Sequence, residues 1–285
     1  MKYIIYTVII LIVIIWILFR EKKNYNQAPK KIWTYWDNPT KIPQTVELCI
    51  ASWKKFHPEY EIVFLTKKNY KGYVTIPEEL TSHHNFNDMP QRFADLIRIW
   101  VLTEHGGVWI DSTILLKGSI EDWLFPRYAE FSGFYIDGFT KNKKFPVIEN
   151  WFFACNKGSL FIKKWRDEFS RMAYFPTVEH YITSLRKEGI DIQGITIPNY
   201  LAMHVACQKV LQSGNYPLDS LYLQKAEDGP FRYLVDAKWD SDKAVELACF
   251  NPSYQGPIMK MRGGERDALE KRLDYDLTVE QCGWI

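Results

Sequence analysis

Three residues that could act on one ligand lie within residues 92–113, whose sequence is RFADLIRIWVLTEHGGVWIDST. Asp95 and Arg98 are three positions apart, and residues with this spacing share one face of a helix. Asp111 follows the apolar residues 108–110, which we predict to form a buried parallel strand. An acid at the carboxyl end of such a strand lies where open α/β sheets bind their ligands. A carboxylate with an arginine nearby suits a divalent cation that carries a diphosphate.

The elements that must position these residues alternate between strand and helix. Apolar residues recur at steps of three and four in the helical segments, whereas the strand segments are short, apolar and bounded by turn residues. The predicted order is a strand at 31–36, a helix at 43–56, a strand at 61–65, a helix at 93–104 and a strand at 108–111. This alternation is typical of a largely parallel, doubly wound α/β sheet.

The second half of the chain shows weaker patterns. We predict strands at 131–136 and 151–154, and helices at 160–172, 178–188, 202–211 and 265–277. The helix at 160–172 is the clearest, because Phe161, Trp165 and Phe169 recur every four residues. We treat residues 30–285 as one domain whose second half packs against the sheet.

Composition excludes some classes of protein. The net charge of the 285 residues is +2, and no basic stripe is present, so we expect no binding to nucleic acid. The five cysteines are scattered, without a C-x-x-C pair, which argues against a zinc site and a disulfide framework. Such cysteine usage favours a reducing, cytosolic setting for the main domain.

The N-terminus has the composition of a membrane anchor. Residues 3–19 (YIIYTVIILIVIIWILF) are apolar apart from one threonine and would span about 25 Å as a helix. Charged residues follow at once, without a small-residue cleavage site, so we predict an uncleaved single-pass anchor at 1–20 and a linker at 21–29. Basic residues are more numerous after the span, which favours a domain on the cytoplasmic face of the membrane. A Golgi-type lumenal arrangement is the alternative.

Five segments together resemble the capsular polysaccharide synthesis glycosyltransferases, which are relatives of the sugar transferases with an Asp-x-Asp motif. The segments are KIWTYW (31–36), SWKKFHPEYEIVFLTKKNY (52–70), ADLIR (94–98), GGVWIDST (106–113) and ENWFFACNKG (149–158). The resemblance implies a GT-A type fold, with a Rossmann-like mixed sheet flanked by helices. It also implies a nucleotide-sugar donor (most often a UDP-sugar), a glycan or polysaccharide acceptor, Mn²⁺ or Mg²⁺ as cofactor, and transfer with retention.

The chain departs from the wider superfamily at one position. Where many members have Asp-x-Asp, it has Asp111-Ser112-Thr113, which leaves a metal with one fewer carboxylate. We expect Asp111 to bind the metal directly or through water, and Thr113 to bind a phosphate or a metal-bound water. An acid that only caps the turn after the strand is the alternative for Asp111. Trp109 we expect to be core.

Three polar residues are the candidates for contacts near the reacting centre. Asp95 and Arg98 could hold the hydroxyls of the donor sugar, and Arg98 could bind the diphosphate, since its planar fork suits either ligand. An ordinary surface ion pair is the alternative for these two residues. Asn150 could contact hydroxyls of the donor or of the acceptor, or it could cap the turn before a strand.

Other residues could complete the donor site. Trp33, Tyr35 and Trp36 lie at the end of the first strand, and we expect one of these rings to stack on the nucleotide base while the others pack. Lys260 and Arg262 could close over the diphosphate from the C-terminal end. Two further functions remain open: a catalytically degenerate protein that binds nucleotide or glycan, and a membrane-anchored component of a polysaccharide assembly complex.

Overall fold

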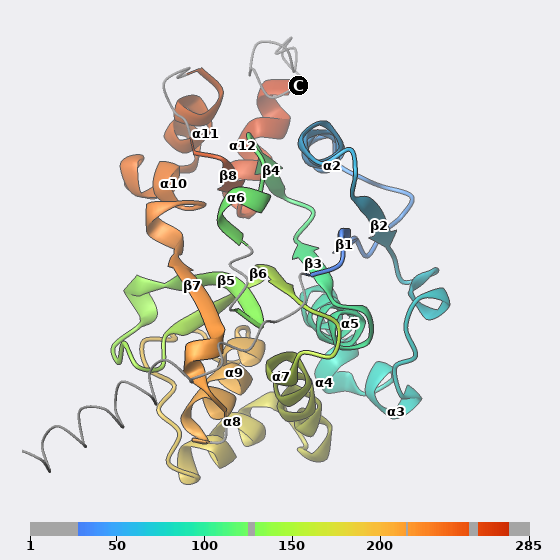
Figure 1. The fold of residues 1–285 in the computed structure, drawn as a ribbon, viewed down its shortest axis with the longest axis vertical. Helices are drawn as coiled ribbons and strands as arrows, with labels where there is room; N and C mark the ends of the chain where they lie inside the picture. The colour runs from blue at the N-terminus through green and yellow to red at the C-terminus, as the bar shows by residue number, and fades with distance from the viewer. Residues whose placement is uncertain (1–27, 125–128, 215, 251–255, 274–285) are drawn as a thin grey trace, which may run out of the picture.

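A six-stranded mixed sheet forms the centre of the molecule (Figure 1). The computed structural model describes residues 28–124, 129–214, 216–250 and 256–273. The sheet has the strand order β2-β1-β3-β6-β5-β7, and β4 and β8 form a second, two-stranded sheet. The strands are β1 (Lys31–Tyr35), β2 (Glu61–Leu65), β3 (Gly107–Ile110), β4 (Ile114–Leu116), β5 (Phe131–Ile136), β6 (Val147–Cys155), β7 (Leu221–Lys225) and β8 (Ile258–Lys260).

Strand β6 runs in the opposite direction to the other five strands of the large sheet. Strands β2, β1 and β3 are parallel to one another, and so are β5 and β7, whereas β6 runs antiparallel to both of its neighbours. The prediction of a largely parallel sheet is therefore right for every strand of the large sheet except β6, whose reversal gives the mixed sheet that the family resemblance implied. No α-helix joins β5 to β6 across residues 137–146, and a connection of this kind joins antiparallel neighbours.

Helices cover both faces of the sheet, and each face has its own hydrophobic core. One face carries α3 (Glu78–Thr81), α4 (His84–Asn87), α5 (Pro90–His105), α7 (Leu160–Ser170), α8 (Val178–Lys187) and α9 (Ala202–Gln212). The other face carries the small sheet with α2 (Gln44–Phe56), α6 (Glu121–Leu124), α10 (Arg232–Asp236), α11 (Ser241–Phe250) and α12 (Gly263–Leu273). Short 3₁₀ helices are Tyr70–Gly72, Asp137–Phe139, Arg171–Tyr174, Leu218–Ser220 and Ala226–Asp228.

Most of the predicted elements are present at nearly the predicted bounds. The strands predicted at 61–65 and 131–136 are confirmed as β2 and β5, and the helices predicted in the second half correspond to α7, α8, α9 and α12. Residues 274–277, the end of the last predicted helix, lie outside the described residues. Elements that the sequence did not predict are α3, α4, α6, α10, α11, β4, β7 and β8.

A Gly-Gly turn connects α5 to β3 and places Asp111. Gly106 and Gly107 have φ angles of 69° and 101°, a region that disfavours side chains. A Cβ atom on Gly107 would also lie 2.6 Å from the carbonyl oxygen of Lys31. The two glycines therefore allow α5 to end directly beside β1, so that Asp111 follows β3 at the edge of the sheet.

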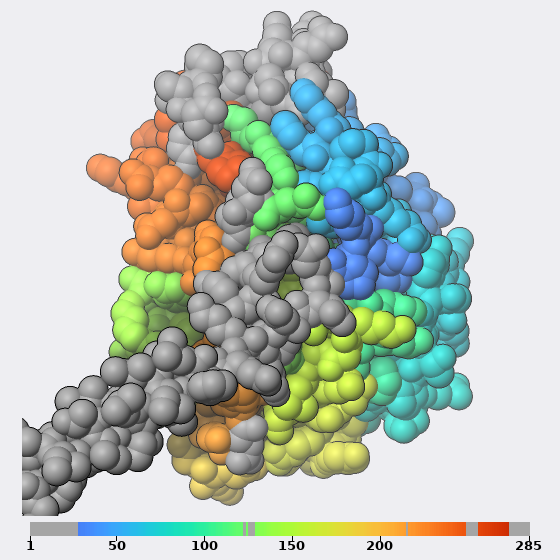
Figure 2. Space-filling model, in the orientation of Figure 1, coloured from blue at the N-terminus to red at the C-terminus, as the bar shows by residue number. Residues whose placement is uncertain are grey.

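The small sheet brings the C-terminal part of the chain to the same edge. Strand β4 follows Asp111 after three residues and pairs antiparallel with β8, with Ile114 opposite Lys260. Figure 2 shows the green residues of this region between the blue residues of α2 and the red C-terminal residues. Residues far apart in the sequence therefore meet next to the end of β3.

The predicted anchor at 1–20 and most of the predicted linker at 21–29 lie outside the described residues. Within the part of the chain that the structure describes, no helix is long and apolar enough to cross a membrane. The domain boundaries at 20 and 29 stay predictions.

Candidate active site

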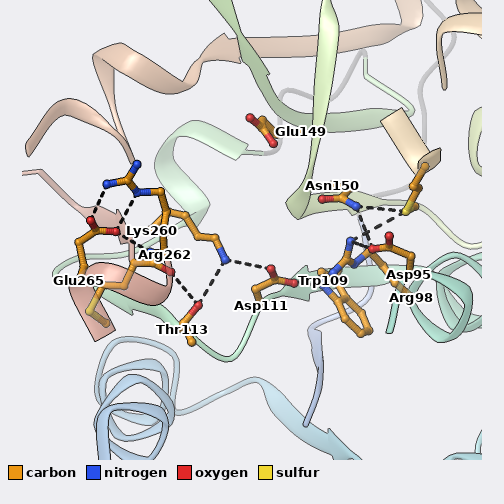
Figure 3. A network of polar contacts seen from close by, with 12 residues as sticks. Asp95, Arg98, Trp109, Asp111, Thr113, Glu149, Asn150, Lys260, Arg262 and Glu265 are labelled. Atoms are coloured by element: carbon orange, nitrogen blue, oxygen red, sulfur yellow. Dashed lines mark hydrogen bonds and ion pairs between the residues drawn. The ribbon is translucent and has the colours of Figure 1, made fainter. Parts of the chain in front are cut away.

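Arg98 joins the two acids that the sequence singled out (Figure 3). Its Nη1 atom donates to Oδ1 of Asp95 at 2.6 Å, and its Nη2 atom donates to Oδ1 of Asp111 at 2.7 Å. Asp95 and Arg98 are buried, with 8% and 4% of their surface exposed. The spacing in α5 thus aims both residues inward, and the pair is not the solvated surface ion pair that was the alternative.

Trp109 fixes the position of Asp111 as well as filling the core. The side chain is 1% exposed, which confirms the predicted burial. Its Nε1 atom donates to Oδ1 of Asp111 at 2.9 Å, and the guanidinium carbon of Arg98 lies 4.8 Å from its ring centre. The indole therefore supports both partners of one ion pair, a role that the apolar strand pattern did not indicate.

Lys260 occupies the other side of Asp111. Its Nζ atom donates to Oδ2 of Asp111 at 3.0 Å and lies 3.3 Å from the hydroxyl oxygen of Thr113. The Thr113 hydroxyl in turn donates to the carbonyl oxygen of Met261 at 3.0 Å. Arg262 takes a different partner, because its guanidinium binds the buried carboxylate of Glu265 at 2.6 Å. Of the two cations suggested at this end of the chain, Lys260 is the one bound to Asp111.

The two acids respond differently to their surroundings. Burial raises the pKa of Asp95 to about 6, although the charge of Arg98 opposes the shift. Burial also acts to raise the pKa of Asp111, but the charges of Lys260 and Arg98 outweigh it and hold that pKa below its ordinary value. Asp111 is therefore charged throughout the neutral range, whereas Asp95 can gain a proton in mildly acidic solution.

Asn150 reaches the same cluster from β6. Its Nδ2 atom donates to Oδ1 of Asp95 at 2.9 Å and lies 3.4 Å from the sulfur of Met203. The pairing of β5 and β6 is irregular here: Gly133 is opposite Phe153, but Tyr135 is opposite Ile148. The three extra residues of β6 form a bulge, a device that redirects side chains near functional sites.

Residues at the start of α9 complete the polar cluster of Asp95, Arg98, Asp111 and Asn150. The sequence did not predict their role. Met203 contacts both Arg98 and Asn150 through its sulfur. His204 and Glu149 are both buried, and Nε2 of His204 lies 3.1 Å from Oε2 of Glu149. The available signal was the polar pair His204 and Gln208, four residues apart on the face of α9 that is otherwise occupied by apolar residues.

The three aromatic residues of the first strand are not equivalent. Trp33 is 1% exposed and donates from Nε1 to the carbonyl oxygen of Gly106, so its ring cannot stack on a base. Tyr35 is also buried, and its hydroxyl donates to Asp37. Trp36 is only partly buried. Of the three predicted donor-binding rings, Trp36 is therefore the one that a base can reach.

The residues around Asp111 fit a divalent cation in part. Mg²⁺ and Mn²⁺ bind one or two carboxylates together with phosphate oxygens and water, and Asp111 supplies one carboxylate. Its Oδ2 atom is bound to Lys260, so a cation would have to displace this amine. Within the described residues, no group of three His, Cys, Asp or Glu side chains is placed to hold a metal.

The family of the chain follows from its sequence. The profile of a family described as "Capsular polysaccharide synthesis protein" matches residues 15–183, which is more than half of the chain. The chain belongs to this family. The match includes Asp95, Arg98, Asp111 and Asn150, whereas Met203, His204 and Lys260 lie beyond it.

Other similarities of the chain are more distant. It is 28% identical over 164 residues to the O-glycosyltransferase braB of Annulohypoxylon truncatum, and the alignment covers 51% of the chain but only 38% of that relative. Among solved structures, galactosyltransferase LgtC in complex with donor and acceptor sugar analogs is 12% identical, with 90% of this chain and 100% of that chain covered and a TM-score of 0.43. The PaToxG glycosyltransferase is 17% identical, with 66% and 79% covered and a TM-score of 0.37.

Proposed function

We propose that this protein is a glycosyltransferase that moves a sugar from a nucleotide-sugar donor to a glycan acceptor. The observation that carries the proposal is the charge arrangement at the end of β3, where Arg98 and Lys260 bind the two oxygens of Asp111. Departure of a nucleoside diphosphate requires its negative charge to be stabilised, and fixed cations at a sheet edge supply this stabilisation. The family and the glycosyltransferase relative support the same reaction class.

The donor sugar would bind beside Asp95. One carboxylate oxygen of Asp95 accepts hydrogen bonds from Arg98 and Asn150, whereas Oδ2 takes none within the described residues. This second oxygen can accept a hydrogen bond from a sugar hydroxyl, and the carbonyl oxygen of Asn150 can accept another. These hydrogen bonds would orient the donor sugar so that an acceptor hydroxyl can attack its anomeric carbon.

The diphosphate would bind between Asp111 and Lys260. In the donor complex Lys260 turns from Asp111 to a phosphate oxygen, and Thr113 donates its hydroxyl to the same group. Mn²⁺ or Mg²⁺ would be held by Asp111, with phosphate oxygens and water as the other ligands. When bound, the cation supplies further stabilisation of the charge on the leaving diphosphate. We propose a UDP-sugar as donor and retention of configuration, both on the basis of the family resemblance.

The test uses the full chain in detergent, with UDP-glucose, UDP-galactose and UDP-N-acetylglucosamine, and measures release of UDP with Mn²⁺ or with EDTA. Asp111→Asn is the test variant. Asp167→Asn is the matched control, because Asp167 is an exposed acid on α7. We expect release from one donor, a loss of about 100-fold or more in Asp111→Asn, and no loss in Asp167→Asn.

One observation favours a second function. Both oxygens of Asp111 are already bound to cationic side chains, and Thr113 replaces the second acid, which would suit a protein that binds nucleotide without turnover. Binding of UDP by calorimetry, without release from any donor, would support this degenerate function. Absence of UDP binding would overturn both the transferase and the degenerate nucleotide-binding function.

We also propose that residues 1–20 anchor the protein in a membrane, with the domain on the cytoplasmic face. The apolar segment at 3–19 and the basic residues that follow it support this arrangement. Protease treatment of sealed inverted vesicles should digest the domain, and protection of the domain would indicate the opposite face.

A further inference from the structure

The turn that precedes α9 borders the polar cluster and exposes large side chains. Ile197 and Tyr200 are 60% and 48% exposed, although the backbone N–H of Tyr200 donates to the carbonyl oxygen of Ile197 in an ordered turn. The buried residue Arg92 of α5 holds this turn, because its guanidinium binds the carbonyl oxygens of Asn85 and Asn199. The helix that carries Asp95 and Arg98 therefore also fixes the position of Tyr200.

Tyr200 lies close to the acids of the donor site. Burial of part of its ring raises the pKa of Tyr200, and the carboxylates of Asp95 and Asp111 raise it further. Tyr200 also lies three residues before Met203, whose sulfur contacts Arg98 and Asn150, and nearly half of its side chain is open to solvent. An aromatic ring with one wet face and one polar end is suited to a ligand that is itself part apolar and part hydroxylated.

Glu149, on the bulge of β6, offers a hydrogen-bond acceptor beside the start of α9. Its Oε2 atom is held by His204, which lies one helical turn beyond Tyr200. Its Oε1 atom takes no hydrogen bond within the described residues, and 9% of the Glu149 side chain is exposed. In the view of Figure 3, the Glu149 carboxylate lies above Lys260 and Asn150, and no dashed line joins it to either.

We propose that Tyr200 and Glu149 form the acceptor subsite, in which Tyr200 stacks on a sugar ring and Glu149 accepts a hydrogen bond from one of its hydroxyls. His204 acts as a positioning residue that holds Glu149. The inference rests on the proposed function, because it names where the second substrate of that reaction binds. A glycan must enter from solvent, and Tyr200 is an exposed aromatic residue in the turn just before Met203, which contacts Arg98 and Asn150.

The test measures initial rates of sugar transfer by the full chain to methyl glycosides of glucose, galactose, mannose and N-acetylglucosamine. The acceptor KM and the donor KM are determined separately for each variant. Tyr200→Ala should raise the acceptor KM about tenfold, equivalent to about 1.4 kcal/mol, and raise the donor KM much less. Tyr200→Phe, which keeps the ring, should restore most of the acceptor affinity. Tyr174→Ala is the matched control, since Tyr174 is 83% exposed on the separate segment Arg171–Tyr174.

The positioning role of His204 has its own readout. Glu149→Gln and His204→Gln should both raise the acceptor KM, and the double variant should be no worse than the more damaged single variant, because the two residues act as one unit. Equal increases in donor KM and acceptor KM, or independent effects of the two substitutions, would overturn the proposal.

Binding measurements separate this inference from the proposed function. If the wild type transfers no sugar, saturation-transfer NMR with the same methyl glycosides still tests the subsite in the presence of UDP. Binding that is lost in Tyr200→Ala and kept in Tyr174→Ala would support a sugar subsite even when the transferase proposal has failed. Failure of every glycoside to bind the wild type would overturn the subsite.

Discussion

Asp95 and Asp111 bind the same guanidinium, yet their surroundings give them different properties. Asp95 has one cation and the amide of Asn150 as partners and is almost fully buried, so its pKa rises to about 6. Asp111 has Arg98 on one oxygen and Lys260 on the other, which keeps its pKa below the ordinary value. Asp111 has two cations in direct contact and the more exposed side chain, 25% against 11% for Asp95, and both differences favour its charged form.

Removal of Arg98, the cation that binds both acids, should have the largest effect on stability and activity. Arg98→Met leaves Asp95 without a cation and Asp111 with Lys260 alone. We expect a loss of about 3 kcal/mol in the free energy of unfolding, since an unpaired buried charge remains, and a fall of at least about 100-fold in kcat/KM. Urea unfolding and donor turnover measure the two effects.

The matched control is Arg166→Met. Arg166 pairs with an exposed acid, Asp167, and exposed pairs contribute about 1 kcal/mol or less. A result for Arg98→Met that is no larger than the result for Arg166→Met would show that the bridge between the two acids contributes little.

The pH dependence of kcat/KM should distinguish the role of Asp95 from that of Asp111. As the pH falls below about 6, Asp95 gains a proton and loses its charge, whereas Asp111 does not. We expect kcat/KM to fall about tenfold per pH unit below this point, as for a single essential carboxylate. If kcat/KM does not change between pH 7 and pH 5, Asp95 is not an essential carboxylate that must be charged.

Protonation of Asp95 should have the opposite effect on stability: it lowers kcat/KM but favours the folded protein. Because its pKa is raised from 3.8 to about 6, the folded protein binds more protons than the unfolded chain between these values. The contribution of Asp95 to stability is therefore lost as the pH rises through this window. Urea unfolding at pH 4.5 and 7.0 should show this loss in the wild type but not in Asp95→Asn.

The smallest effect should come from the hydroxyl beside Asp111. Thr113→Val keeps the shape of the side chain and removes the hydrogen bond to Met261 and the contact with Lys260. One hydrogen bond contributes about 1 kcal/mol, so we expect a fall of about fivefold in kcat/KM for the donor. Thr81→Val, at an exposed site on α3, is the control. A loss as large as that of Arg98→Met would place Thr113 in direct contact with the reacting atoms.

The sequence predicted the part of the cluster that depends on local geometry. Asp95 and Arg98 are neighbours because of helical spacing, and Asp111 lies at the sheet edge because a buried strand precedes it. The sequence did not predict that Lys260 binds Asp111, because this contact requires the pairing of two three-residue strands, β4 and β8. Strands of this length carry too little hydrophobic pattern to be recognised.

The contacts made by α9 were beyond prediction for a different reason. The helix itself was predicted, but its rotation about its axis and its contact with β6 depend on the packing of both halves of the chain. The bulge of β6 likewise has no local signature, so Glu149 and Asn150 could not be assigned their partners His204 and Asp95. Which of the three rings at 33, 35 and 36 stays accessible was also not predicted, since an aromatic residue at the end of a strand can face either the core or a ligand.

The small sheet of β4 and β8 determines when the site can be completed during translation. Asp111 and Lys260 are 149 residues apart in the sequence. Domains fold as the chain leaves the ribosome, N-terminal parts first. Until β8 has emerged, Asp111 has Arg98 as its single cationic partner, and β4 has no strand beside it. A nascent chain that stops before residue 258 therefore lacks half of the charge balance around Asp111, even though every residue of the ADLIR and GGVWIDST segments has been synthesised.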